Sequence, residues 1–133
     1  RETAEQLIVQ ARTDRAQLAE TFSHRQLFAC PQSEAAKDWF ADIALSASGI
    51  GTVQSAFSLL AEDGRQDLTH VPVPAWIIYG EKDVVVPKDL IRIQQESIPG
   101  SRLICLPDSG HGIMYDQLEL FNAHFLKALK SCV

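Results

Sequence analysis

Two short apolar runs in the second half of the chain constrain its fold more than any other feature. The run AWIIYG, residues 75–80, follows a Pro-rich entry, and the run RLICL, residues 102–106, follows a Pro-Gly turn. Both have the length and apolar content of buried strands. Between them, Pro87 suits the first position of a helix that we expect to reach about Ser97. This order predicts two parallel strands joined by a right-handed crossover helix.

The rest of the chain has helical periodicity. Apolar residues recur at helical spacing over 4–22, 36–44 and 53–61, and a last helix is expected over 118–129. The stretch SASGIG, residues 46–51, is typical of a turn. Two parallel strands are too few for a stable sheet, because such a sheet needs further neighbours and cover on both faces. We therefore expect an α/β fold in which the second half is one end of a larger sheet.

Composition excludes several classes of partner. The net charge is −5, so the chain lacks the basic footprint of a nucleic-acid-binding or lipid-binding protein, and no apolar run has membrane-spanning length. Cys30, Cys105 and Cys132 show no metal-ligand spacing, and their odd number favours a reduced, cytoplasmic compartment. Cys105 lies in an apolar run and is expected to be buried.

The sequence begins RETAEQ, without Met. This start predicts a processed chain or a piece of a longer protein. The lack of a signal peptide is then uninformative about the parent protein.

Two titratable residues follow the ends of the two expected strands. Asp83 lies shortly after Gly80, and His111 lies in the loop after the second strand. Chemistry in an open parallel sheet is found at the carboxyl ends of its strands. An Asp followed by a His fits the second and third members of a Ser-Asp-His triad, in which the Asp orients the ring and the His takes a proton from a hydroxyl. Each residue alone would be an ordinary loop residue, and the pairing favours catalysis.

The stretch VPVPAWIIYGEKDVVVP…IPGSRLICLPDSGHG…ELFNAHFLKAL resembles the C-terminal third of an α/β-hydrolase. The similarity covers roughly residues 70–129, and the order of the motifs makes it specific. Residues 1–68 are similar in style to the helical cap of that family, and SAFSLLAEDGRQDL resembles the last cap helix of its esterase, lactonase and perhydrolase branch. The resemblance implies a cap-like segment over 1–68 and a β-α-β-α part of the core over 69–133. It also implies that Asp83 is the triad acid and His111 the base, with no metal or organic cofactor.

The sequence departs from the family at the nucleophile. It contains no G-x-S-x-G elbow, and SASGIG has the wrong order and no preceding strand. The oxyanion hole, which depends on that elbow and an earlier loop, is missing too. Ser109 is a poor substitute, because it stands two residues from the histidine and not on an elbow. We therefore expect this chain alone to be inactive, with its nucleophile in another segment.

Four apolar residues are candidates for substrate contacts. Trp39 and Phe57, in the cap-like segment, are core residues more often than ligand contacts, but in a cap they would line an apolar pocket. Met114 and Tyr115 follow the histidine directly and are expected to form part of the acyl or alcohol pocket.

Three interpretations stay open. The first is a serine hydrolase for small esters, thioesters or lactones, with a small-molecule ester-like substrate. The second is a non-catalytic α/β-hydrolase-derived fragment that acts as an interaction module and self-associates through exposed strand edges. The third is part of a complete hydrolase of about twice this length, whose N-terminal half is missing here. Dehalogenases and epoxide hydrolases share much of this region with an Asp nucleophile, so the resemblance names a class and no reaction.

Overall fold

A computed structural model describes residues 2–131 of the chain, so Cys132 lies outside the described residues. Within them the chain divides into two units. The first unit comprises residues 2–25 and Gln32–Asp63, and the second comprises Gln26–Pro31 and residues 64–131. The predicted division into cap-like and core-like segments at residue 68 stays a prediction.

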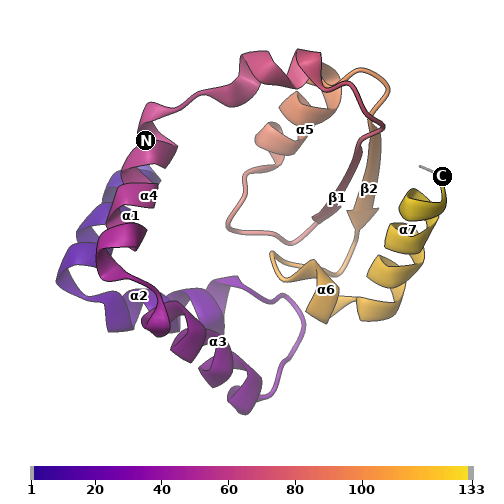
Figure 1. Cartoon of the computed structure of the whole chain (residues 1–133). Helices are drawn as coiled ribbons and strands as arrows, with labels where there is room; N and C mark the ends of the chain where they lie inside the picture. Colours follow the sequence, from indigo (N-terminus) through magenta and orange to yellow (C-terminus); the bar gives the residue numbers. More distant parts are fainter. Residues whose placement is uncertain (1, 132–133) are drawn as a thin grey trace. The chain divides into compact units, whose positions relative to one another are not determined.

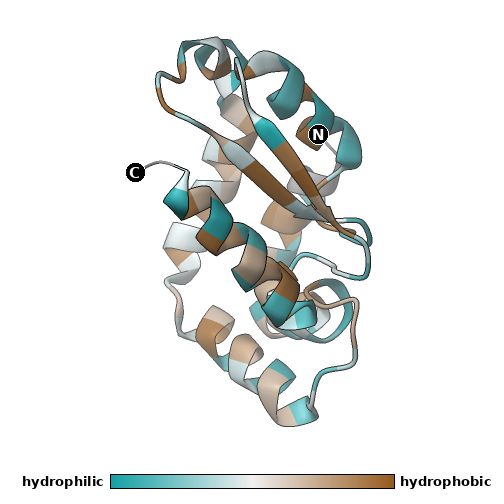
Figure 2. Cartoon of the chain, turned by 90° about the vertical axis from the view of Figure 1, so that its right-hand side faces the viewer, coloured by the Kyte–Doolittle hydropathy of each residue, from teal (hydrophilic) through white to brown (hydrophobic). Residues whose placement is uncertain are grey.

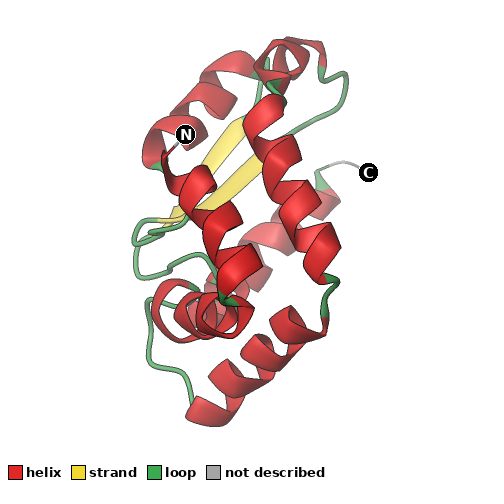
Figure 3. Cartoon of the chain, turned by 90° about the vertical axis from the view of Figure 1, so that its left-hand side faces the viewer, coloured by secondary structure: helices red, strands yellow, loops and turns green. Residues whose placement is uncertain are grey.

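The first unit is built from helices (Figure 3). Its elements are α1 (Glu2–Thr13), α2 (Arg15–Thr21), a π-helical turn η1 (Phe22–Gln26), α3 (Glu34–Ser46) and α4 (Gly49–Ala61). The single helical stripe expected over 4–22 is divided at Asp14, whose carboxylate accepts the N–H of Gln17 and caps α2. Arg15 then ties α2 to α3, because its Nη2 donates to carbonyl oxygens at the end of α3.

The turn expected over SASGIG is shorter than predicted, because α3 continues to Ser46 and α4 already begins at Gly49, which leaves only Ala47 and Ser48 between the helices. The Ser48 hydroxyl accepts the N–H of Gly51 at 3.1 Å and caps the helix. A serine cap satisfies one of the otherwise unpaired N–H groups of the first turn, and this gain offsets the low helix propensity of the two glycines.

The second unit contains the strands. Its elements are a 3-10 helix η2 (Gly64–His70), β1 (Trp76–Gly80), α5 (Lys88–Ser97), β2 (Arg102–Leu106), α6 (Ile113–Asp116) and α7 (Leu118–Lys130). The two strands are parallel, with α5 on one face of the pair and α7 on the other (Figures 1 and 2). The strand, helix, strand, helix order and the parallel pairing predicted from the apolar runs are confirmed.

The strands are less buried than expected. β1 is half-buried over most of its length, and Cys105 in β2 is exposed, so the prediction of a buried Cys105 is wrong. The reason is that Cys105 lies on the α5 side of the pair, where α5 covers the sheet incompletely and leaves a hollow of about 310 Å³ beside Tyr79 and Leu103. The carboxyl ends differ, because Gly80 and Leu106 are both buried.

Among residues 2–131, no single helix is both long and apolar enough to cross a bilayer. Within the same described residues, α3 and α4 taken together reach that length and composition, and the two are bent by 89° at the break between them.

Candidate active site

The loops that follow β1 and β2 lie side by side. Gly80 and Leu106 end the two strands and are partners in the sheet register. The N–H of Glu81 donates to the carbonyl oxygen of Leu106, and the N–H of Lys82 donates to that of Ser109, both at 2.9 Å. These main-chain bonds bring the residues after β1 next to the loop that carries His111.

Asp83 and His111 meet between these two loops. Nδ1 of His111 lies 3.0 Å from Oδ2 of Asp83. The other carboxylate oxygen, Oδ1, accepts the N–H groups of Val85 at 2.7 Å and Val86 at 3.0 Å. The Asp83 side chain is 12% exposed and that of His111 is 35% exposed. The structure thus brings together the two residues that the sequence predicts as acid and base, and their catalytic roles stay predictions.

The surroundings of Asp83 stabilise its charged form. Burial by itself would raise the pKa of Asp83, but the N–H of Val86, the ring of His111 and the N–H of Val85 together hold that pKa below its ordinary value. An ionised carboxylate only accepts hydrogen bonds, so the proton lies on Nδ1 of His111. The neutral ring then has its free lone pair on Nε2. A general base needs this tautomer, because Nε2 is the atom that takes the proton.

A segment from much earlier in the sequence packs against the His111 loop. We call residues 27–30 the strap; they belong to the same unit as that loop. The N–H of Gly112 donates to the carbonyl oxygen of Leu27 at 2.6 Å, and the rings of Phe28 and Tyr115 meet edge to face with centroids 5.8 Å apart. The strap therefore contacts residues that directly follow His111.

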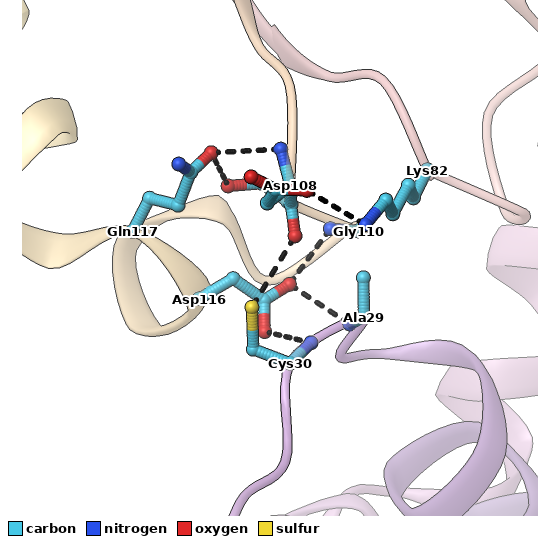
Figure 4. Close-up of polar contacts among 8 residues, drawn as sticks. Ala29, Cys30, Lys82, Asp108, Gly110, Asp116 and Gln117 are labelled. Carbon is cyan, nitrogen blue, oxygen red and sulfur yellow. Dashed lines mark hydrogen bonds and ion pairs between the residues drawn. The ribbon is translucent and has the colours of Figure 1, made fainter.

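Asp116 joins the strap to the loop (Figure 4). Its Oδ2 accepts the N–H of Ala29 at 2.9 Å and that of Gly110 at 2.7 Å, and its Oδ1 accepts the N–H of Cys30 at 3.0 Å. Three main-chain donors from two separate segments thus converge on one carboxylate. The residue next to it, Gln117, accepts the N–H of Asp108 and the hydroxyl of Ser109, both at 3.0 Å.

Sequence reasoning missed Asp116 and Gln117. The available signal was a pair of polar residues between the apolar stretches IMY and LELF, close behind the histidine. The hydroxyl of Ser109, which is fully buried, donates to Gln117. Through this hydrogen bond Ser109 ties the His111 loop to Gln117.

The four expected substrate contacts fall in two groups. Met114 and Tyr115 lie on α6, close behind His111 in the chain, and both side chains are exposed. Trp39 and Phe57 lie in the first unit and are also exposed, and Trp39 packs against the ring of Phe40 with centroids 5.0 Å apart. The structure describes the two units separately, so the part of all four residues in binding stays a prediction.

The structure has two surface hollows that the acid–base pair does not line. One is the hollow of about 310 Å³ between α5 and the sheet, and the other, of about 410 Å³, lies in the first unit beside Gly49 and Ile50. Neither Asp83 nor His111 lines them. In the part of the chain that the structure describes, no group of three or more His, Cys, Asp or Glu residues could hold a metal ion.

The chain is similar to several known proteins. No protein-family model matches it. The AB hydrolase superfamily protein YisY of Bacillus subtilis (strain 168) is 34% identical over 99 residues, which are 74% of this chain and 37% of that protein. The solved esterase from Exiguobacterium antarcticum matches with a TM-score of 0.91 and 33% identity, over 97% of this chain and 48% of that one. A bromoperoxidase from Bacillus anthracis matches with a TM-score of 0.90 and 28% identity, over 97% and 49%. The chain thus spans about half the length of these two solved proteins. Its match to the Bacillus subtilis protein covers a smaller share, 37% of that protein's length.

Proposed function

Because this chain belongs to the α/β-hydrolase superfamily and has the fold of the C-terminal half of such proteins, we propose that it supplies the acid and base of a serine-hydrolase triad. Asp83 is the acid and His111 the base. The nucleophilic serine and the oxyanion hole belong to a segment that precedes these residues in a longer protein, or to a second polypeptide. The cytoplasmic location is part of this proposal.

The reaction we propose is acyl transfer from a small ester, thioester or lactone. The serine hydroxyl attacks the carbonyl carbon while Nε2 of His111 takes its proton, and the imidazolium then gives that proton to the leaving oxygen or sulfur. Water, activated in the same way, releases the acid and the free serine. Asp83 keeps the proton of His111 on Nδ1 and stabilises the imidazolium, which its ionised carboxylate can do because its pKa is low.

The observation that carries the proposal is the 3.0 Å contact between Asp83 and His111 at the ends of neighbouring parallel strands. The name of the Exiguobacterium protein, an esterase, supports ester chemistry in preference to the other reactions of the superfamily. Met114 and Tyr115 stand beside the histidine in the chain, and we propose that they line the substrate pocket. We also propose a substrate contact for Trp39 and for Phe57, each within the first unit.

The proposal is tested by an intact mass and a serine probe. The protein is purified from its native cells through a C-terminal tag, and the mass of every co-purifying polypeptide is measured. A fluorophosphonate is then added, because it reacts with a serine that its site has activated. We expect the probe on a serine outside the 133 residues, and its loss when His111→Gln is introduced. His124→Gln, on α7, is the matched control and should leave labelling unchanged.

A single species of 14.7 kDa that takes no probe would overturn the enzyme proposal. It would favour the alternative, a non-catalytic α/β-hydrolase-derived module that self-associates. One observation supports that alternative: α7 exposes the apolar residues Leu118, Phe125 and Leu129, each about half exposed. Figure 2 shows hydrophobic bands that alternate with hydrophilic ones along this helix. Sedimentation equilibrium distinguishes the two, because the module predicts a stable dimer or larger oligomer of the 14.7 kDa chain.

A further inference from the structure

We infer that Asp116 is a positioning residue for His111: its carboxylate fixes the strap against the His111 loop and so keeps the imidazole within reach of Asp83. This inference deepens the proposed function and rests on it, since Asp116 would act on the same site.

The first support is where the contacts of Asp116 fall. Oδ2 accepts the N–H of Gly110, the residue directly before His111, at 2.7 Å. On the other side, the N–H of Gly112 donates to Leu27 of the strap at 2.6 Å. The backbone of His111 is therefore held on both sides, once by Asp116 and once by the strap that Asp116 binds. Hydrogen bonds to an ionised carboxylate are the stronger kind.

The second support is how closely the strap approaches the loop. A Cβ on Gly110 would lie 2.9 Å from the main-chain nitrogen of Ala29, and one on Gly112 would lie 2.9 Å from ring atoms of Phe28. The two glycines around the histidine are thus places where strap atoms occupy the space of a side chain. At this close approach the N–H groups of Ala29 and Cys30 both donate to Asp116, so its carboxylate binds the strap where it lies nearest the loop.

The third support is that the rest of the loop is fixed separately. Gln117 accepts the N–H of Asp108 and the hydroxyl of Ser109. The ion pair between Asp108 and Lys82, at 2.7 Å, is exposed on both sides and contributes little. Removal of the Asp116 carboxylate would therefore free the N–H groups of Gly110, Ala29 and Cys30 while the start of the loop stays held. The strap would keep its contacts through Leu27 and the Cys30 thiol, which donates to the carbonyl oxygen of Asp108 at 3.3 Å. The expected effect lies at His111 itself.

The experiment reads the Nδ1 proton of His111 by NMR in the 133-residue chain, labelled at its four histidines and assigned with His111→Gln. In Asp116→Asn an amide N–H2 replaces one carboxylate oxygen and faces a main-chain N–H, so at least one contact becomes repulsive. We expect the Nδ1 proton to exchange with water about tenfold faster, the change that follows from loss of one hydrogen bond to a charged group. Asp116→Glu, which keeps the carboxylate, should retain part of the protection.

The control is Asp108→Asn, which makes the same change at an exposed carboxylate of the same loop and should leave the Nδ1 proton unchanged. If Asp116→Asn frees the amides of Ala29 and Cys30 but leaves the His111 signal as in the wild type, Asp116 is merely structural and the inference is overturned. If Asp116→Asn fails to fold, the same two signals, the His111 Nδ1 proton and the amides of Ala29 and Cys30, are measured in Asp116→Glu, and the same outcomes decide.

Asp83→Asn separates the inference from the proposed function. If this variant removes the protection of the Nδ1 proton and the Asp116 variants do not, the acid–base pair stands and only the role of Asp116 falls. If Asp83→Asn has no effect, the pair does not form in solution, and the proposed function and the inference both fall.

Discussion

Gly80 lies directly against the main chain of Gly110. A Cβ on Gly80 would be 2.2 Å from the carbonyl oxygen of Gly110 and 2.3 Å from that of Ser109. Both atoms belong to the backbone, so no side-chain rotation could relieve the contact. The residue that ends β1 must therefore lack a side chain, because the loop that carries His111 runs across it.

Gly80→Ala is expected to lower the free energy of unfolding by about 3 kcal/mol, the upper end for overpacking at a buried site. The loop must move, so the contact between His111 and Asp83 should be lost as well. Urea unfolding measures the first effect and the His111 Nδ1 proton the second. Gly64→Ala is the control, since a Cβ there meets nothing closer than Asp67 Oδ2 at 3.8 Å. Equal midpoints for the two variants would contradict the expected clash.

The low pKa of Asp83 makes part of the stability depend on pH. Above the unfolded-state value of about 3.9 the carboxylate is charged in both states and its contribution is fully present. As the pH falls through the lower folded-state pKa, the group is protonated in both states and the contribution is lost. The difference in unfolding free energy between wild type and Asp83→Asn should therefore shrink below about pH 4, as measured by urea unfolding at a series of pH values.

Asp89→Asn, at a side chain that is 88% exposed, provides the comparison for simple loss of a carboxylate. A wild-type–Asp83→Asn difference that stays constant from pH 6 to pH 2, within the error of the extrapolation, would speak against a stabilised Asp83 carboxylate.

The two glycines beside His111 should differ in their tolerance of alanine. At Gly110 the new methyl group would meet the main-chain nitrogen of Ala29, whereas at Gly112 its nearest neighbours are ring atoms of Phe28, which can turn aside. We expect Gly110→Ala to lower the unfolding free energy by about 2–3 kcal/mol and Gly112→Ala by about 1 kcal/mol. Thermal unfolding followed by circular dichroism shows which of the two variants is less stable. If Gly112→Ala were the less stable one, the main chain at Ala29 would move aside more readily than the ring of Phe28.

Arg15 should stabilise the first unit through the end of α3. Its Nη2 donates to the carbonyl oxygens of Ala44, Leu45 and Ala47, at 3.2, 3.2 and 2.7 Å. A positive charge at a helix C-terminus also interacts favourably with the negative end of the helix dipole. Arg15→Ala is expected to lower the unfolding free energy by about 1–2 kcal/mol. Arg15→Lys should recover only part of this loss, because the shorter lysine side chain would not reach all three carbonyl oxygens. Arg12→Ala is the control, and an equal effect at both positions would exclude a specific role for these contacts.

Much of the acid–base pair could be predicted from the sequence. The two apolar runs and the intervening helix require parallel strands, and parallel strands place their carboxyl ends together, so Asp83 and His111 had to lie near one another. This reasoning works because the sequence alone shows the two apolar runs and the helix between them. The right-handed crossover is a general rule for parallel strands and needs no further information.

The strap could not be predicted in the same way. Asp116 binds the N–H groups of Ala29 and Cys30, and a main-chain donor leaves no trace in the identity of its residue. The start of α4 was missed for a related reason, since the serine cap outweighs a local preference of glycine for turns. The exposure of Cys105 depends on how far α5 covers the sheet, which periodicity does not report.

The strap also determines how the chain can be cut. Residues 26–31 belong to the second unit while the segments on both sides of them belong to the first, so the polypeptide passes from one unit to the other three times. A nick after Asp63 would leave the strap on the N-terminal piece, bound to the C-terminal piece through Asp116 and Gly112. An expression clone that starts at the strands would lack Ala29 and Cys30. Of the three main-chain N–H groups that Asp116 accepts, its carboxylate would then keep only that of Gly110. A design that keeps the His111 loop intact must therefore carry residues 26–31 with it.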